Sequence, residues 1–152
     1  QNIVIGGAAG AFPPLVGWAA MTGQIDLTAL YLFAIIFYWT PPHFWALALY
    51  RREDYARAGV PMLPVVAGEE ATRRQIVLYS VLLVASTLLL YPLGAMGPLY
   101  GGSALVLGGL FVVLAVRLRR ERSARSAIRL FGYSMAYLAL LFAAMVADRL
   151  MV

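Results

Sequence analysis

The residues best suited to chemistry lie in one stretch, YWTPPHFWALALYRREDYARAGVPMLP, which covers positions 38–64. It holds the only histidine of the chain, His43, directly after the double proline Pro41-Pro42. The first charge cluster follows a few helical turns later and consists of Arg51, Arg52, Glu53 and Asp54. An apolar helix, a buried polar group and a charged rim in this order indicate a site at a membrane surface.

His43 lies inside an apolar segment, where ionisable side chains are rare and usually functional. Trp39, Phe44 and Trp45 surround it, and Tyr50 marks the end of the apolar run. Such aromatic residues either line a cavity around the histidine or belong to the aromatic belt of the membrane interface. The structural alternative is an imidazole bonded to a backbone carbonyl that the prolines set free. The residue types leave these alternatives open.

The charged residues that follow suit a diphosphate bound with magnesium. Carboxylates bind the metal through oxygen, and guanidinium groups form paired hydrogen bonds with phosphate oxygens. The loop 51–75 mixes its arginines with four acids, namely Glu53, Asp54, Glu69 and Glu70. The second basic segment, 117–129, has only one acid, and topology alone explains its arginines.

Helical spacing connects His43 with the charged cluster. Positions 47, 50 and 54 follow His43 at steps of four, three and four, which places them on one stripe of a helix. If the helix is continuous, His43 and Asp54 share a face and lie about 16 Å apart along its axis.

The composition places the chain in the membrane class. It has 152 residues, of which 62% are hydrophobic and 12% are charged, whereas soluble domains contain about 25% charged residues. The absence of cysteine excludes disulfides, thiolate metal sites and a cysteine nucleophile. The net charge is +5, but the arginines flank apolar runs, so we expect membrane lipid and no nucleic acid as a partner.

The elements that position these residues are predicted to be membrane helices in one all-α, polytopic bundle. Apolar runs predict five spans, at about 3–22, 27–50, 76–96, 99–116 and 130–147. The first two spans are each interrupted by a double proline, Pro13-Pro14 and Pro41-Pro42, and such paired interruptions point to a cavity between the spans.

The loops predict the orientation of the chain. Eleven of the twelve arginines lie in loops 51–75 and 117–129, which the positive-inside rule places in the cytoplasm. Loop 51–75 has an apolar middle, so we expect it to fold back onto the membrane face. The chain starts at Gln1 without a signal-peptide pattern and enters an apolar run at once, which suggests the later part of a longer membrane protein.

Three strings, NIVIGGAAGAFPPLVGWAA, WTPPHFWALAL and EDYARAGVPMLPVV, resemble the later half of the protohaem IX farnesyltransferase (haem O synthase) branch of the UbiA-type intramembrane prenyltransferases. The resemblance runs from residue 2 to about residue 76. The WTPPHFW and AGVPMLP strings separate this branch from the benzoate and chlorophyll prenyltransferases. The last three spans match only in hydropathy and position.

The resemblance implies spans five to nine of a nine-helix bundle around a lateral cavity, in a bacterial inner membrane. It implies transfer of farnesyl from farnesyl diphosphate to a vinyl group of haem B, with Mg²⁺ bound through the diphosphate and a haem A synthase acting downstream. Its second acidic motif maps onto Glu53, Asp54 and Tyr55 to Arg57.

The resemblance gives each candidate residue a role. Asp54 is the candidate metal ligand, and Arg57 is expected to replace part of the work of a missing second aspartate. Arg51, Arg52, Glu53 and Arg57 are expected at the diphosphate. Trp39, His43, Phe44, Trp45 and Tyr50 are expected in the haem or prenyl pocket, where His43 either ligates iron or accepts a proton from water.

The first acidic motif of the family, an Asn/Asp-rich loop, is absent from these 152 residues, so we expect the chain to be inactive alone. Two other functions remain open at this stage. One is another UbiA-type aromatic prenyltransferase, and the other is half of a membrane transporter, which would also use proline-broken helices.

Overall fold

Seven helices follow one another in the computed structural model, which describes residues 2–151. They are α1 (Asn2–Thr22), α2 (Leu27–Tyr50), α3 (Arg52–Arg57), α4 (Leu63–Val66), α5 (Glu69–Leu89), α6 (Pro98–Glu121) and α7 (Ala124–Leu150). No strand occurs among the described residues, so the expected all-α fold is confirmed.

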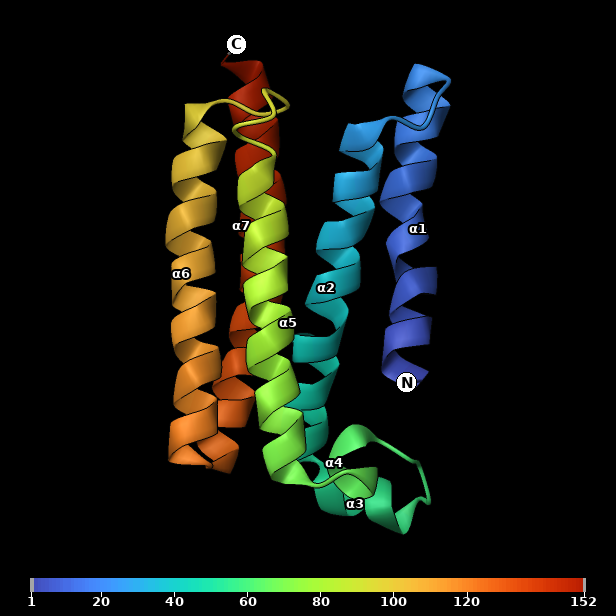
Figure 1. The fold of residues 1–152 in the computed structure, drawn as a ribbon, viewed down its shortest axis with the longest axis vertical. Helices are drawn as coiled ribbons and strands as arrows, with labels where there is room; N and C mark the ends of the chain where they lie inside the picture. The colour runs from blue at the N-terminus through green and yellow to red at the C-terminus, as the bar shows by residue number, and fades with distance from the viewer. Residues whose placement is uncertain (1, 152) are drawn as a thin grey trace.

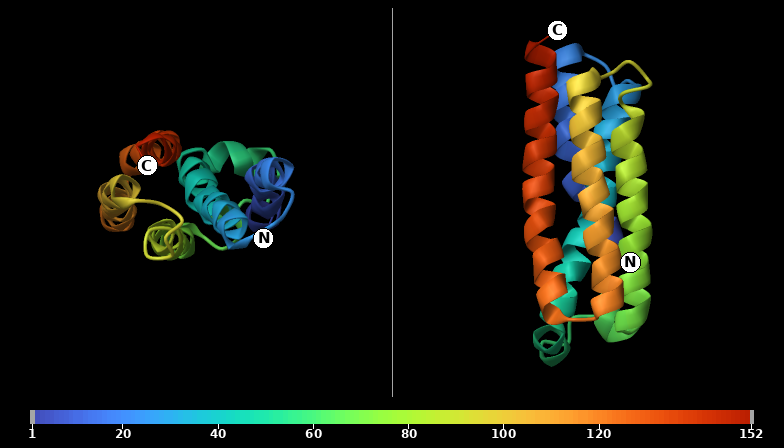
Figure 2. Two further views of the ribbon diagram at one scale, coloured as in Figure 1. Left: turned by 90° about the horizontal axis from the view of Figure 1, so that it is seen from above. Right: turned by 90° about the vertical axis from the view of Figure 1, so that its left-hand side faces the viewer.

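The helix α2 is the centre of the arrangement. It packs against α5 and α7, and these pack against α6 in turn, which closes a ring of four helices (Figure 2). Large apolar side chains fill this ring, among them Ile76, Leu83, Phe111 and Tyr137, all fully buried. On its other side α2 contacts α1, which packs against no other long helix within the described residues.

Two glycines allow close contacts between these helices. A Cβ atom at Gly108 of α6 would lie 2.8 Å from Val84 Cγ1 of α5. A Cβ atom at Gly7 of α1 would lie 3.0 Å from Thr40 Cγ2 of α2. Small residues at such positions are typical of helices that associate in membranes, where packing replaces the hydrophobic effect.

Four of the described helices, α1, α2, α6 and α7, are long and apolar enough to cross a membrane. The expected third span, 76–96, corresponds to the apolar part of α5. This helix begins earlier than expected, at Glu69, because the charged residues of its first turns are good helix formers. It ends at Leu89, and turns occupy most of the residues up to Gly97.

The expected second loop, 117–129, is mostly helical, which corrects the sequence prediction. α6 continues to Glu121 and α7 begins at Ala124. Arginine and glutamate favour helices, and Arg117 pairs with Glu121 one turn later at 3.6 Å. Ser123 then caps α7 by accepting a hydrogen bond from the Ser126 amide.

The double prolines do not end their helices, contrary to the expected interruptions. α1 continues through Pro13 and Pro14, and α2 continues through Pro41 and Pro42. Each proline removes one hydrogen-bond donor from its helix. In lipid no water competes for the other backbone groups, so they keep their hydrogen bonds within the helix and the helix continues.

The expected continuous helix from His43 to Asp54 is wrong. α2 ends at Tyr50, Arg51 has φ −103° and ψ 25°, and the separate helix α3 starts at Arg52. Figure 1 shows α3 and α4 together at one end of the bundle, opposite the end where the chain terminates. The expected loop 51–75 therefore forms two short helices and the first turns of α5.

Candidate functional site

His43 lies in α2 between aromatic rings from two helices. Its imidazole stacks on Trp39 with a centroid distance of 4.2 Å and on Phe131 of α7 at 4.6 Å. Phe44 meets the ring edge-on at 5.1 Å. The histidine is 8% exposed. Three aromatic neighbours therefore hold the plane of the imidazole.

Ser134 of α7 joins this cluster through both its side chain and its backbone. Its Oγ lies 2.6 Å from His43 Nδ1, and its carbonyl accepts a hydrogen bond of 2.8 Å from Trp39 Nε1. The expected alternative of a bond to a carbonyl freed by the prolines is not what the structure shows, because among the described residues the imidazole bonds only to the Ser134 hydroxyl. Ser134 and Phe131 lie in a segment where the sequence showed only hydropathy.

Two of the aromatic neighbours of His43 also line a groove between α1 and α2. The groove has a volume of about 390 Å³. Its lining consists of Asn2, Ile3, Gly6, Gly7, Gly10, Ile36, Trp39, Thr40 and Phe44. The glycines of α1 leave room for this apolar space directly beside the histidine cluster.

Charged residues form a second cavity where α2 meets α3. It has a volume of about 250 Å³ and is lined by Leu49, Tyr50, Arg51, Arg52, Glu53, Asp54 and Glu69. Arg51 Nη1 lies 3.1 Å from Asp54 Oδ2, and Arg52 Nη1 lies 2.9 Å from Glu69 Oε1. We call Arg51, Arg52, Glu53, Asp54 and Glu69 the charged rim.

Glu69 connects this rim to the bundle. Its carboxylate also pairs with Arg73, which is 8% exposed and whose Nε has no hydrogen-bond partner within the described residues. The hydrogen bond from Arg73, with a further contribution from Arg52, lowers the pKa of Glu69 below its ordinary value despite partial burial. The contribution of this carboxylate to stability is therefore present above its ordinary pKa and is lost as the pH falls through the lowered one.

Glu70 connects α5 to the end of α6 in a similar way. Burial raises its pKa, but the hydrogen bond from Arg74 and the charges of Arg122, Arg74 and Arg119 lower it more, so the pKa lies below its ordinary value. Arg122 Nη2 and Arg119 Nε lie 3.4 and 3.7 Å from its oxygens. The two adjacent glutamates thus connect α3, α5 and α6 at one end of the bundle.

Three further candidate residues, Trp45, Tyr50 and Arg57, belong to neither of these two clusters, although Tyr50 lines the charged cavity and Arg57 pairs with a residue of the rim. Trp45 is buried and packs edge-on against Tyr79 of α5 at 5.4 Å. Tyr50 is exposed at the end of α2. Arg57 and Glu53 form an exposed pair at 3.6 Å on α3. The structure therefore groups Trp39, His43 and Phe44 in one cluster, and the residues of the charged rim in another.

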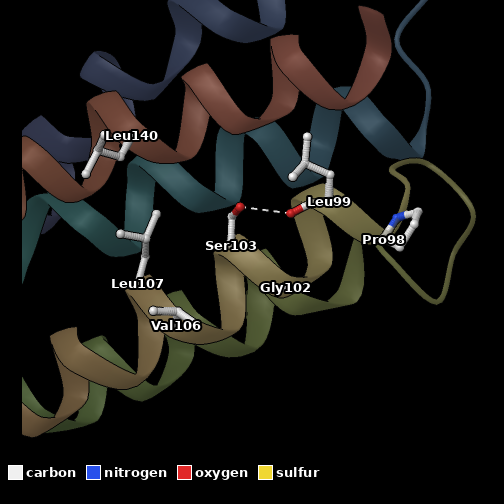
Figure 3. A pocket seen from close by; sticks show the side chains of 7 residues that line it. All are labelled: Pro98, Leu99, Gly102, Ser103, Val106, Leu107 and Leu140. Atoms are coloured by element: carbon white, nitrogen blue, oxygen red, sulfur yellow. Dashed lines mark hydrogen bonds between the residues drawn. The ribbon is translucent and has the colours of Figure 1, made fainter. Parts of the chain in front are cut away.

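A third hollow, of about 570 Å³, is lined by no charged or aromatic side chain of the described residues. Figure 3 shows it along α6, with Leu140 of α7 on its far side. Its single side-chain hydroxyl, that of Ser103, already donates to the Leu99 carbonyl at 2.8 Å. An apolar surface of this kind on a membrane helix suits contact with lipid or another apolar segment.

The oxygen donors of the rim fit magnesium only together with a phosphate ligand. No three histidines, cysteines or acids gather into a metal-binding group between residues 2 and 151. Magnesium usually binds through one or two carboxylates, water and the phosphates of a substrate. Glu53 and Asp54 supply such carboxylates beside Arg51 and Arg52, which suit the phosphates.

These features define the class of protein as an integral membrane protein with a helical bundle, a charged cavity at one end and an aromatic histidine cluster inside it. The UbiA prenyltransferase family model matches residues 1–145, so the chain belongs to this family. No solved structure matches the chain.

Curated relatives support this assignment. A protein of Roseiflexus castenholzii is 62% identical over 149 residues, which are 98% of this chain and 28% of the relative. A protein of Novosphingobium aromaticivorans is 57% identical over 155 residues, which are 99% of this chain and 51% of the relative. Both are named protoheme IX farnesyltransferase. The chain thus spans about half the length of such relatives, or less.

Proposed function

We propose that this protein takes part in the transfer of a farnesyl group from farnesyl diphosphate to a vinyl group of haem B, which gives haem O. The observation that carries the proposal is that the charged rim begins directly after the last residue of α2, the helix that carries the aromatic cluster of His43. The names of relatives with 57% and 62% identity support it.

The chemistry follows from charge. The bond between C1 of the farnesyl group and the diphosphate oxygen breaks, and its electron pair leaves with the diphosphate. Arg51 and Arg52 stabilise the charge on the leaving group by hydrogen bonds. Because both arginines pair with carboxylates in the structure, an incoming diphosphate competes with Asp54 and Glu69 for them. Asp54, with Glu53 beside it, would hold a magnesium ion bound with the substrate, and that ion would further neutralise the charge of the diphosphate.

The acceptor side uses the aromatic cluster. The vinyl π electrons form the new bond to C1 of the farnesyl cation, and the positive charge moves to the carbon next to the porphyrin. Water adds to this carbon and releases a proton, which gives the hydroxyethylfarnesyl group. Trp39 and Phe44 stabilise cationic and prenyl groups through their ring faces. His43 acts on the haem side, either at the iron or as the acceptor of the proton.

The test is haem O formation in membranes. We expect haem O when the chain is co-expressed with the segment of the Novosphingobium relative that it does not cover. We expect none from the 152-residue chain alone, because it offers the diphosphate only the carboxylates of the charged rim. Products are identified by chromatography and mass. Membranes with either partner alone are the controls. Activity of the chain alone, or prenylation of a different aromatic acceptor by the pair, would contradict the proposal.

If the chain were half of a transporter, the same membranes would give a different result. It would move a solute and leave farnesyl diphosphate unchanged, whereas the prenyltransferase releases diphosphate in proportion to haem O.

We further propose that haem O formed here is consumed by a haem A synthase, an enzyme that acts on this product.

We also propose that the end of the bundle with α3 and α4 faces the cytoplasm of a bacterial inner membrane. Eleven of the twelve arginines lie near this end of the helices, and only Arg149 lies at the other. A reporter inserted at Gly68 is expected to read cytoplasmic. Gly94 gives the matched control, because both glycines have positive φ, at 86° and 70°, and lie in connections between helices at opposite ends of the bundle. A periplasmic signal from Gly68 would contradict this orientation.

A further inference from the structure

We infer that Ser134 is a positioning residue that fixes the tautomer of His43, with the proton on Nδ1 and the lone pair on Nε2. This inference deepens the proposed function, on which its catalytic consequence rests. The hydroxyl comes from α7, 91 residues along the chain from the histidine, so tertiary packing creates the pair.

The tautomer follows from counting protons. Ser134 Oγ lies 2.6 Å from His43 Nδ1 and also 2.6 Å from the carbonyl oxygen of Phe131. The hydroxyl has one hydrogen, and a carbonyl oxygen can only accept. The serine therefore donates to Phe131, and the hydrogen between Oγ and Nδ1 belongs to the imidazole. In the neutral ring this leaves Nε2 unprotonated.

The neighbouring side chains keep the imidazole in this orientation. Trp39 and Phe131 cover both faces of the imidazole, with interplanar angles of 18° and 24°. Trp39 is itself tied to the Ser134 carbonyl through Nε1. Within residues 2–151 the imidazole makes no other hydrogen bond, so Nδ1 is anchored while Nε2 is not.

The fixed tautomer has a chemical consequence. A base that accepts the proton of the attacking water needs an unprotonated nitrogen, and so does a ligand of haem iron. Ser134 reserves Nε2 for either task without touching the substrate. In a ring without this hydroxyl, the proton is free to move to Nε2 and block it.

The chain permits a direct test because His43 is its only histidine. Labelling with ¹⁵N-histidine gives one pair of imidazole nitrogen signals, which show by their shifts and N–H couplings which nitrogen carries the proton. We expect the chain in lipid nanodiscs at near-neutral pH to show protonated Nδ1 and unprotonated Nε2. Protonated Nε2 in the unmodified chain would overturn the inference, whatever the enzymatic activity proves to be.

Variants separate positioning from folding. Ser134→Ala is expected to reduce the Nδ1-protonated form to a minor one, and Ser134→Thr, which keeps the hydroxyl, is expected to restore it. Ser80→Ala is the matched control, because Ser80 is also buried and bonds only to a carbonyl of its own helix, at 2.6 Å. An unchanged tautomer in Ser134→Ala would also overturn the inference.

The catalytic consequence is measured separately, in the co-expressed pair. Ser134→Ala is expected to slow haem O formation at least about tenfold and to change its pH dependence, while Ser80→Ala leaves both near the unmodified values. A changed tautomer with an unchanged rate and pH profile would overturn the catalytic consequence. Absence of haem O in every variant, with the expected nitrogen signals, would count against the proposed function alone.

Discussion

Asp54→Asn is expected to lower the rate of haem O formation about a hundredfold, which corresponds to about 2.7 kcal/mol at the transition state. The substitution removes one negative charge from the rim and keeps the shape of the side chain. Asp54 faces two hollows, the charged cavity beside Arg52 and a second one lined by Leu47 and Tyr55. A carboxylate in this place can hold magnesium and diphosphate together.

The same substitution should leave the fold intact. The side chains of Asp54 and Arg51 are 57% and 59% exposed, and such surface pairs contribute little to stability. The loss of rate should become smaller when the magnesium concentration is raised, because more free metal compensates by mass action for weaker binding. The measurement is haem O formation against magnesium concentration in the co-expressed pair.

Asp26→Asn is the matched control for this prediction. Asp26 caps α2 at the opposite end by accepting a hydrogen bond of 3.0 Å from the Ala29 amide, and asparagine caps helices equally well. It should therefore retain the unmodified rate and magnesium dependence. Equal rates for Asp54→Asn and Asp26→Asn would show that Asp54 does not act at the metal.

The charged rim illustrates how far the sequence could predict the site. The cluster from Arg51 to Asp54 was visible as a mixture of acids and arginines, but its geometry was not. The string ALALYRREDYARA contains no glycine or proline, so nothing local marks the break at Arg51. In the structure Arg52 pairs with Glu69 across 17 positions, a tertiary contact that spacing along one helix cannot reveal.

The cluster around His43 shows the same limit. A buried histidine beside Trp39 and Phe44 could be predicted, because all three lie on one short stretch of α2. Ser134 and Phe131 could not, since serine and phenylalanine in an apolar span have no spacing that points to a partner. Only the packing of α7 on α2 assigns them to the histidine.

Asp148 is the second residue whose loss should have a large effect, here on the fold. It lies in the last turns of α7, is 2% exposed, and accepts hydrogen bonds from the amides of Gly97 and Tyr100 at the start of α6. Gly97 provides no side chain for a cap, so a carboxylate from another helix fulfils this role. A negative charge there also complements the positive end of the α6 dipole.

Asp148→Ala would leave two amide groups without an acceptor inside the bundle, and unsatisfied buried donors are costly. We expect hydrogen exchange of the Gly97 and Tyr100 amides to accelerate at least about tenfold, with a lower unfolding midpoint in mixed micelles. Asp148→Asn should fall between, because its amide oxygen still accepts. Glu121→Ala is the control, since its exposed pair with Arg117 contributes little. Equal exchange in Asp148→Ala and Glu121→Ala would mean that α6 begins without help from α7.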